Sequence, residues 1–386
     1  MSPTHLCDEY FDVRDIDLSN PPHNITHVKI DEHFHHPLNH LPPHITHIKF
    51  GDLFNKKIYQ WPPNITHVVF GYNYNQPTIL PPNIQHIVYG RNFNRMIDLP
   101  SSVKHITFGE KFNKPITFPA DIESIVFGDQ FNQILIFNNY QMLKTIKFGR
   151  NYNQTLKLPP HLVDIQFGEH YNQLLELPHS VKFLKFGTHY NQPTTLPHSL
   201  KRVQFGDTYN QITILPPNTK YIRFGMYFNN NIIFNNNLQL LTFCKIERIL
   251  PQHIPHSTSP KPTFIFGDHF NTPVNLPSNV VNVIFGPNYH HPVTLPENVK
   301  HVTFGYGHHE HTTFPKYLSS MSCHYFNPLW MDQLLDKYNL IQLDVTFVDK
   351  PYSNDMHKQM LNHISINRHN SAAKSISLFD VIYKYL

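Results

Sequence analysis

The pair Phe-Gly, or in one case Tyr-Gly, recurs along this chain with a usual interval of 19 residues. Of the 14 glycines in the sequence, 13 occupy this position, and only Gly307 does not. A short fixed period is typical of solenoid proteins, in which each unit is too small to bury its apolar face alone and stacks on its neighbours. We therefore expect about 15 stacked coils rather than one compact domain of 386 residues.

Each unit follows the pattern Leu-Pro-x-x-Ile-x-x-Ile-x-Phe-Gly-x-x-Phe/Tyr-Asn, as in residues 41–55. Apolar residues at Ile48 and Phe50 predict a short strand that turns these side chains inward and the intervening ones outward. Pro42 is expected to fix φ just before the strand, where a missing N–H costs no hydrogen bond. Gly51 is expected to end the strand with a positive φ.

The asparagine that follows the second aromatic residue of each unit is predicted to lie beneath a turn. Its side-chain amide would bond backbone groups of the adjacent coil, and stacked copies would form an asparagine ladder. The predicted ladder residues are Asn55, Asn75, Asn94, Asn113, Asn132, Asn153, Asn172, Asn191, Asn210, Asn229 and Asn271.

Charge and cysteine content narrow the functional classes. Charged residues make up 15% of the chain and the formal net charge is +4, a bias too weak to favour a nucleic-acid partner. Cys7, Cys244 and Cys323 form no CxxC pair, which argues against a disulfide framework and a cysteine-type zinc module. The N-terminus has no signal-peptide pattern and no apolar run approaches 18 residues, so we expect a soluble intracellular protein without a membrane partner.

The chain resembles the FNIP repeat family, named for a Phe-Asn-x-Pro string that appears here at residues 112–115, in a Tyr-Asn form at 190–193, and again at 270–273. The resemblance covers about residues 25–328. It implies a fold related to leucine-rich repeats and a role as a protein-interaction scaffold. The family is abundant in social amoebae and in giant viruses of amoebae, and a viral member would act in the host cytoplasm.

These features predict a mainly β repeat solenoid, with right-handed coils similar to leucine-rich repeats and a parallel sheet on one face. We expect an N-terminal cap at residues 1–24, the solenoid at 25–328, and a C-terminal cap or small α/β module at 329–386. The caps would shield the two exposed ends of the stack.

The C-terminal segment leaves the repeat pattern. Helical spacing is predicted for 329–338, 356–364 and 376–386, and the alternation of a strand for 341–347. A cap over the last coil is the simpler interpretation, and a module that recruits host machinery is the alternative. Some viral members of the family carry an F-box, which implies a ubiquitin-ligase adaptor. About 24 residues precede the first repeat here, and we expect these to be too few for an F-box.

One outward position is histidine in five successive coils. Stacked imidazoles could bind a metal or act as a pH switch, because their protonated forms repel one another. The simpler interpretation is a half-exposed Thr-His dipeptide inherited by duplication, since the column continues without histidine. The column consists of His27, His47, His67, His86 and His105, followed by Ser124, Thr145, Asp164 and Phe183.

Basic residues gather on the same predicted face further along the chain, with few opposite charges among them. Such a surface could attract an acidic partner and make its association depend on salt. The alternative is a solvated face whose charges keep the sheet soluble. The candidate partner-binding residues are Lys144, Lys147, Lys182, Lys185, Lys201, Arg202, Lys220 and Arg223.

Histidines also replace the ladder asparagine near both ends of the repeats. Their spacing follows no established zinc site, and degenerate terminal coils explain the substitutions. This group comprises His35, His290 and His309, with His291, His308, Glu310 and His311 nearby.

No nucleophile motif, phosphate-binding glycine loop or pair of catalytic acids is present, because the glycines are used in turns. We therefore predict no catalytic residues, no metal and no cofactor. The predicted function is a non-enzymatic repeat scaffold that binds an unidentified protein partner, of acidic character if the basic face is the site. The alternative is a target-recognition adaptor, with or without a link to ubiquitin, that recruits host machinery through its C-terminal segment.

Overall fold

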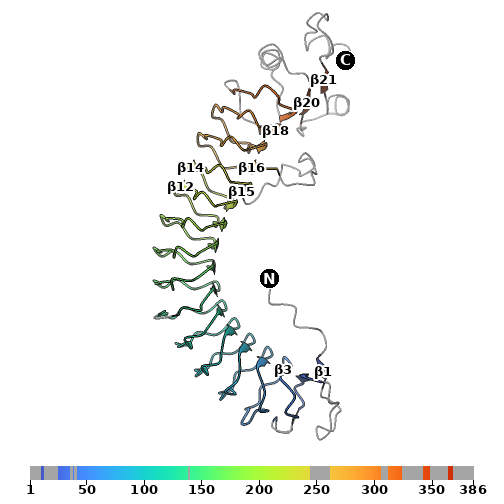
Figure 1. Cartoon of the computed structure of the whole chain (residues 1–386), viewed down its shortest axis with the longest axis vertical. Helices are drawn as coiled ribbons and strands as arrows, with labels where there is room; N and C mark the ends of the chain where they lie inside the picture. The colour runs from blue at the N-terminus through green and yellow to red at the C-terminus, as the bar shows by residue number, and fades with distance from the viewer. Residues whose placement is uncertain are drawn as a thin grey trace, which may run out of the picture. The chain divides into compact units, whose positions relative to one another are not determined.

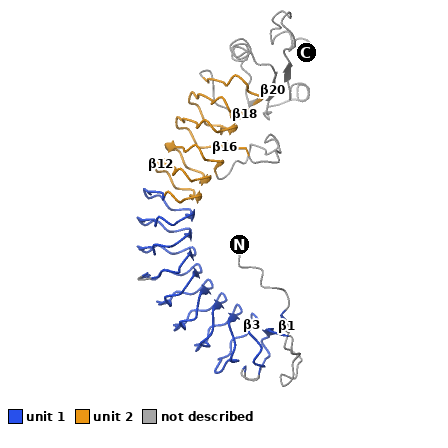
Figure 2. Ribbon diagram, viewed as in Figure 1, with its two compact units in different colours: residues 1–197 blue, residues 198–386 orange. Residues whose placement is uncertain are grey.

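The chain is described from a computed structural model that covers residues 10–12, 25–34, 38, 41–137, 140–243, 261–305, 312–323, 342–347 and 364–367. It divides into two compact units, residues 1–197 and residues 198–386 (Figure 2). Within the described residues the regular elements are all strands. No helix among them has the length and apolarity needed to cross a bilayer.

Unit 1 is a stack of coils, each of which contributes one short strand to a parallel sheet (Figure 1). Every neighbouring pair from β1 to β10 is parallel and in register, because each strand occupies the same place in its coil. The strands are β1 (Phe11–Asp12), β2 (His27–Ile30), β3 (His47–Phe50), β4 (His67–Val69), β5 (His86–Val88), β6 (His105–Thr107), β7 (Ser124–Val126), β8 (Thr145–Lys147), β9 (Asp164–Gln166) and β10 (Phe183–Lys185).

Unit 2 repeats this plan. Its main sheet pairs β11, β13 and β15 to β20 in parallel, and β12 pairs with β14 in a second, two-stranded sheet. The strands are β11 (Arg202–Gln204), β12 (Thr213–Ile214), β13 (Tyr221–Phe224), β14 (Ile232–Ile233), β15 (Leu240–Phe243), β16 (Thr263–Ile265), β17 (Asn282–Ile284), β18 (His301–Thr303), β19 (Ser320–Cys323), β20 (Gln342–Phe347) and β21 (Ile364–Asn367).

The last two strands mark the end of the repeat pattern. The predicted strand at 341–347 is confirmed by β20, which pairs in parallel with β19, whereas β21 pairs with β20 antiparallel. The helix predicted for 356–364 is wrong at Ile364, which begins β21 opposite Val345, because the free edge of β20 offers backbone hydrogen bonds that helical spacing alone does not reveal. The helices predicted for 329–338 and 376–386, and most of the cap at 1–24, lie outside the described residues.

Two columns of aromatic rings fill the core of unit 1. One column comes from the strand ends and the other from the third residue after each glycine. In one coil the rings of Phe108 and Phe112 stack with centroids 3.9 Å apart, and Phe112 stacks on Phe131 of the next coil at 6.0 Å. All three are buried. A single coil could not bury these rings, so their removal from water drives the stacking of coils.

The repeated glycine is needed because adjacent coils approach each other closely at this position, and not because the backbone has an unusual conformation there. The positive φ predicted for Gly51 is wrong, since neither this residue nor Gly71 or Gly109 has a φ in the left-handed region. A Cβ added at Gly71 would instead lie 2.0 Å from the carbonyl oxygen of Gly51. The same distance would separate a Cβ at Gly109 from the Gly90 oxygen. Stacked turns bring backbone against backbone here and leave no space for a side chain.

Candidate functional site

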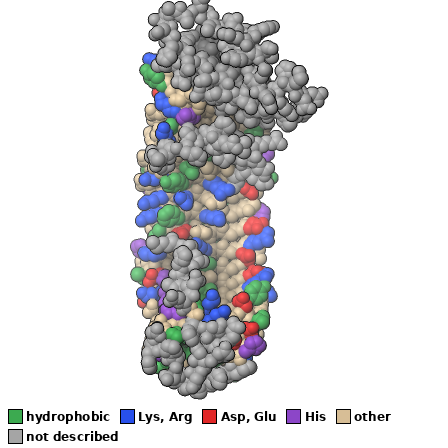
Figure 3. Space-filling model, turned by 90° about the vertical axis from the view of Figure 1, so that its right-hand side faces the viewer, with side chains coloured by type: hydrophobic (Ala, Val, Ile, Leu, Met, Phe, Trp, Pro, Cys, Tyr) green, Lys and Arg blue, Asp and Glu red, His purple; other side chains and the backbone are tan. Residues whose placement is uncertain are grey.

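The outward side of the unit 1 sheet carries two columns of half-buried or exposed side chains. Strand register aligns the first residues of β2 to β10, so that His27 lies opposite His47 and His86 opposite His105. The same column then continues through Ser124 of β7. The third residue of each strand forms the neighbouring column. Figure 3 shows this face, on which Lys and Arg side chains gather.

The five histidines of the first column form a continuous stack of rings. Successive centroids are 3.8, 4.0, 4.1 and 4.3 Å apart, and the ring planes differ by 18° or less. At one end, the ring of Tyr10 meets His27 edge-on at 5.6 Å. At the other, Glu123 lies 3.9 Å from Nε2 of His105. These spacings follow from the strand spacing of the sheet, since each ring projects from the same position of its coil.

This stack favours neutral imidazoles. Partial burial, together with repulsion between the positive forms of the adjacent histidines, lowers the pKa of His67 to about 3. The same causes lower the pKa of His47 to about 4, and burial together with His105 lowers that of His86 to about 4. Burial also lowers the pKa of His105, although Glu123 opposes the shift. The rings of His47, His67, His86 and His105 are therefore uncharged at neutral pH.

Threonine hydroxyls fix the orientation of the first three rings. The Oγ1 atoms of Thr26, Thr46 and Thr66 lie 2.8 to 2.9 Å from Nδ1 of the histidine that follows each. Thr66 Oγ1 also donates to the carbonyl oxygen of Thr46 at 3.3 Å, so its oxygen can accept a hydrogen bond from Nδ1–H of His67. That pattern favours the tautomer with an unprotonated Nε2.

Four of the predicted partner-binding residues lie in unit 1 on strands β8 to β10 and the positions just before them. Lys147 and Lys185 flank Gln166 in one register column. Lys144 and Lys182 occupy the residue that precedes the strand, and both are exposed. Within the described residues, no carboxylate lies within ion-pair distance of any of the four lysines. Unit 1 therefore brings these four cations together on one face.

A shallow hollow of about 680 Å³ borders Lys147 and Lys185. The acidic side chains of the hollow are engaged with Arg150. Glu169 Oε2 lies 2.6 Å from Arg150 Nε, and Asp129 accepts a hydrogen bond from the Arg150 backbone N–H at 3.1 Å. These acidic side chains therefore do not pair with Lys147 and Lys185, and the two ammonium groups can contact a ligand in the hollow.

The other four predicted residues form a second cluster in unit 2. Arg202 of β11 lies opposite Tyr221 of β13, and its guanidinium carbon is 5.1 Å from the centroid of the tyrosine ring. This distance is typical of a cation–π interaction. Lys220 donates its backbone N–H to the carbonyl oxygen of Lys201 at 2.9 Å, so the two lysines belong to adjacent coils. Arg223 lies opposite Gln204. The eight candidates are thus two clusters, one in each unit.

Phe183 is a further candidate binding residue. The sequence pattern predicts its place in the histidine column but gives no reason to expect a function for it. It begins β10 between Lys182 and Lys185, and its side chain is 42% exposed. The side chain lies on the solvent side of the sheet, outside the core, and offers apolar contact area beside these lysines. An aromatic residue in an otherwise polar column is the sequence signal that reveals it.

The predicted ladder asparagines accept hydrogen bonds from one coil to the next. In unit 1, each Oδ1 from Asn55 to Asn172 accepts from the backbone N–H of the following ladder asparagine, at 2.9 to 3.0 Å. In unit 2, Asn210 accepts from Asn229 at 2.8 Å and Asn229 from Asn271 at 2.7 Å. The ladder satisfies a backbone donor in each turn, which is a structural role.

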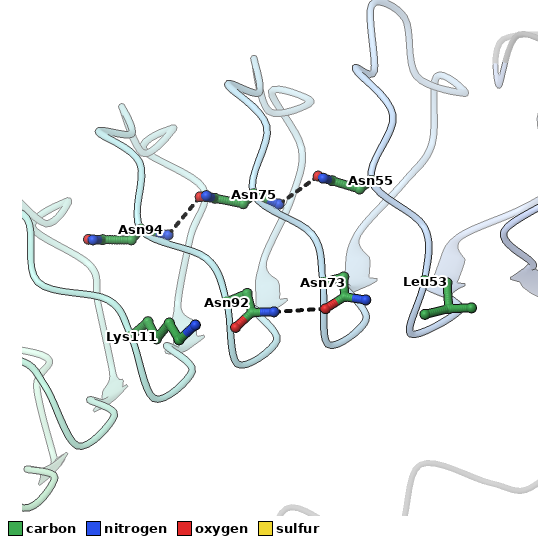
Figure 4. A pocket seen from close by; sticks show the side chains of 7 residues that line it. All are labelled: Leu53, Asn55, Asn73, Asn75, Asn92, Asn94 and Lys111. Carbon is green, nitrogen blue, oxygen red and sulfur yellow. Dashed lines mark hydrogen bonds between the residues drawn. The ribbon is translucent and has the colours of Figure 1, made fainter.

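A second hollow, of about 520 Å³, runs beside this ladder (Figure 4). Its polar groups already bond one another, since Asn92 Nδ2 donates to Asn73 Oδ1 at 2.7 Å and Asn55 Oδ1 accepts from the Asn75 backbone. We assign these asparagines to coil stacking. The lining consists of Leu53, Asn55, Asn73, Asn75, Asn92, Asn94 and Lys111.

The histidines that replace the ladder asparagine in unit 2 continue the same contacts. His290 donates its backbone N–H to Asn271 Oδ1 at 2.9 Å, and Nε2 of His291 lies 2.9 Å from the Asn271 carbonyl oxygen. Both residues therefore bond the preceding coil. The other members of this predicted group, His35, His308, His309, Glu310 and His311, lie outside the described residues.

Comparison with known proteins supports a repeat fold of this kind. The profile of the FNIP Repeat family matches residues 74–111 and 171–208. Among solved structures, the chain is similar to CroV588, described as a circular leucine-rich-repeat protein, with 26% identity and a TM-score of 0.56. That likeness covers 80% of this chain and 61% of the CroV588 chain, so the protein spans less than two thirds of its relative.

A second solved structure is YopM from Yersinia enterocolitica WA-314, at 15% identity and a TM-score of 0.48, covering 80% of this chain and 75% of YopM. No curated protein matches the chain. One strand per coil, a parallel sheet and the likeness to CroV588 define a protein of the leucine-rich-repeat-like class. Within that class, the two matched stretches, and the recurrence of the same residues in neighbouring coils, make the chain similar to FNIP repeat proteins.

Proposed function

We propose that this repeat protein is a non-enzymatic scaffold that binds an acidic protein partner on its sheet face. Lys144, Lys147, Lys182 and Lys185 project from neighbouring coils of unit 1, where Asp164 is the acidic residue among them. Over residues 144–147, 163–166 and 182–185, four lysines and one aspartate give a net charge of +3. A concentrated positive potential on a rigid sheet speeds the association of an acidic partner.

Phe183 would supply apolar contact at this surface, which the lysines alone do not provide. Interfaces gain most of their affinity from a few aromatic or arginine residues near the centre, with charged residues at the rim. Phe183 lies between two of the lysines and is exposed. In unit 2, Lys201, Arg202, Lys220 and Arg223 offer the same kind of cationic surface beside Tyr221.

We also propose the domain limits given by the repeat pattern, with caps at 1–24 and 329–386 around a solenoid at 25–328. The parallel pairing of β20 with β19 supports a cap, because it covers the edge of the last repeat strand. An adaptor role for the C-terminal segment remains the second candidate. Removal of residues 329–386 separates the two roles, since loss of a cap lowers the stability of the repeats, whereas loss of a recruiting module removes one partner from a folded scaffold.

Affinity capture from amoebal lysate, at low and at moderate salt, tests the scaffold function. One variant changes Lys144, Lys147, Lys182 and Lys185 to Ser. A control changes Lys57, Lys111, Lys114 and Lys157 to Ser, which removes the same charge at positions outside the strands. We expect an acidic partner to be held by the intact protein and the control, released at moderate salt, and lost from the first variant. Equal recovery by both variants would refute the proposed surface.

A further inference from the structure

Two histidines and a glutamate converge in the turns that follow β9 and β10. Glu169 and His170 come directly after Gly168, and His189 occupies the position of His170 in the next coil. Their ligand atoms all lie within 4.8 Å of one another. Among the described residues, no other three His, Cys, Asp or Glu side chains bring their ligand atoms this close together. The residues are partly or fully exposed, so an ion can reach them from solvent.

Backbone hydrogen bonds hold the two turns in register. The N–H of His170 donates to the carbonyl oxygen of Arg150 at 3.0 Å, and the N–H of His189 donates to that of Glu169 at 2.9 Å. The two imidazoles therefore project from equivalent points of adjacent coils. Their separation is fixed by the fold, and only side-chain rotation is needed to adjust it.

Ring orientation distinguishes this pair from the histidine stack on the sheet. The rings of His170 and His189 have centroids 5.0 Å apart and planes tilted by 37°. In the stack, the planes of His67 and His86 differ by 9°. An imidazole nitrogen coordinates a metal in the plane of its ring, so parallel rings direct their lone pairs along parallel lines. Tilted rings can direct theirs toward one point.

Glu169 is held in place as an ionised ligand. Arg150 Nε lies 2.6 Å from one of its carboxylate oxygens, and Arg150 Nη2 donates to the other at 3.2 Å. The hydrogen bond from Arg150 lowers the pKa of Glu169. A carboxylate has about four acceptor sites, so these two bonds leave others for a metal. Hydrogen bonds of this kind orient ligands in protein metal sites.

We propose that Glu169, His170 and His189 form a binding site for a divalent transition-metal ion, with Zn²⁺ the expected occupant. Two imidazoles and one carboxylate suit zinc, whereas Mg²⁺ and Ca²⁺ prefer sites made of oxygen ligands alone. Three protein ligands leave a coordination position for water. The ion would join two consecutive coils.

The chain contains a matched comparison for this site. Arg91 and Glu110 form the same ion pair, three coils earlier along the solenoid. There the two positions that correspond to the histidines hold Lys111 and Gln130. The arginine–glutamate ion pair is thus a recurring contact between turns. Of these two pairs, only at Arg150 and Glu169 do two histidines, His170 and His189, complete the proposed metal site.

Histidine carbethoxylation, followed residue by residue with mass spectrometry, tests the proposal. The intact protein is treated with and without Zn²⁺. We expect Zn²⁺ to slow the modification of His170 and His189 and to leave the exposed His161 and His179 unchanged, and we expect Mg²⁺ to have no effect. In the variant His189→Gln, His170 should lose its protection, because a two-ligand site holds zinc weakly.

A gain-of-site variant completes the design. Lys111→His combined with Gln130→His should create Zn²⁺ protection at both new histidines, beside Glu110. Protection of His170 that persists in His189→Gln, or its absence from the intact protein across the zinc titration, would overturn the site. The result does not depend on partner binding, because neither measurement involves the lysines of the sheet face.

Discussion

The imidazole rings of His47 and His67 lie nearly parallel, with their centroids 4.0 Å apart and their planes 15° from each other. We predict that this stack makes unit 1 sensitive to acid. These histidines take up protons near pH 6.5 in the unfolded chain, whereas the pKa values of His47, His67 and His86 in the folded stack are about 4 or below. The unfolded state therefore binds more protons in this window, and the free energy of unfolding falls as the pH falls through it.

Melting temperatures measured between about pH 7 and about pH 4 test this dependence. His67→Thr, which introduces the residue found at Thr145 of the same column, should reduce the loss of melting temperature on acidification. His161→Gln removes an exposed histidine outside the stack and serves as the control. The prediction fails if the intact protein and both variants lose melting temperature in parallel.

Replacing a repeat glycine by alanine should lower the free energy of unfolding strongly in the middle of the stack and only slightly at its beginning. A Cβ at Gly109 would lie 2.0 Å from the Gly90 carbonyl oxygen, a backbone atom that cannot move without separating the coils. At Gly51 the nearest atoms would be 3.4 Å away. We expect Gly109→Ala to lower the free energy of unfolding by more than about 4 kcal/mol and Gly51→Ala by about 1 kcal/mol or less. Urea unfolding measures both, and similar losses would contradict the close-approach explanation.

Loss of one ladder asparagine should cost more than loss of an asparagine in an exposed turn. Asn113 Oδ1 accepts from the Asn132 backbone N–H at 3.0 Å and from Gln133 Nε2 at 2.9 Å. Asn113→Ala leaves those donors without their acceptor, and we expect a loss of about 1–3 kcal/mol in urea unfolding. Asn151 is exposed, and its backbone N–H donates to Asp129. Asn151→Ala should therefore change stability by less than about 0.5 kcal/mol, and equal effects at the two sites would exclude a stabilising ladder.

Two tyrosines in the same core column should respond oppositely to the loss of their hydroxyl groups. The hydroxyl of Tyr190 bonds Thr194 at 2.5 Å, whereas the buried hydroxyl of Tyr171 has no hydrogen-bonding partner among the described residues. Leu175 occupies the position equivalent to Thr194. We expect Tyr171→Phe to be neutral or stabilising by about 1 kcal/mol, because it removes an unsatisfied polar group, and Tyr190→Phe to destabilise by about 1 kcal/mol. Differential scanning calorimetry of the two variants distinguishes these outcomes, and destabilisation in both would show that Tyr171 is satisfied.

Much of the fold follows from the repeat because equivalent residues in stacked coils become neighbours. The alignment of His47 with His67, and of Lys147 with Lys185 across Gln166, is given by counting residues between strands. The alternation of Ile48 and Lys49 places one side chain in the core and the other in solvent. These features depend on order along the chain, which is what a sequence records.

The sequence did not reveal why a glycine follows each strand. A glycine after a strand is compatible with a positive φ or with close contact, and only the position of the preceding coil distinguishes them. The convergence of Glu169, His170 and His189 depends in the same way on how adjacent turns direct their side chains. Nothing in the spacing separates that pair of histidines from other repeated ones.

The sequence by itself therefore determined the solenoid class, the strand positions and the columns of residues, because periodic burial of apolar side chains allows only one face of each coil to be inside. The tertiary structure decided which neighbours touch within a column: parallel imidazoles on the sheet, tilted ones in the turns, and backbone against backbone at the glycines. Those outcomes depend on distances of a few ångströms between coils, which are set by packing after the chain has stacked.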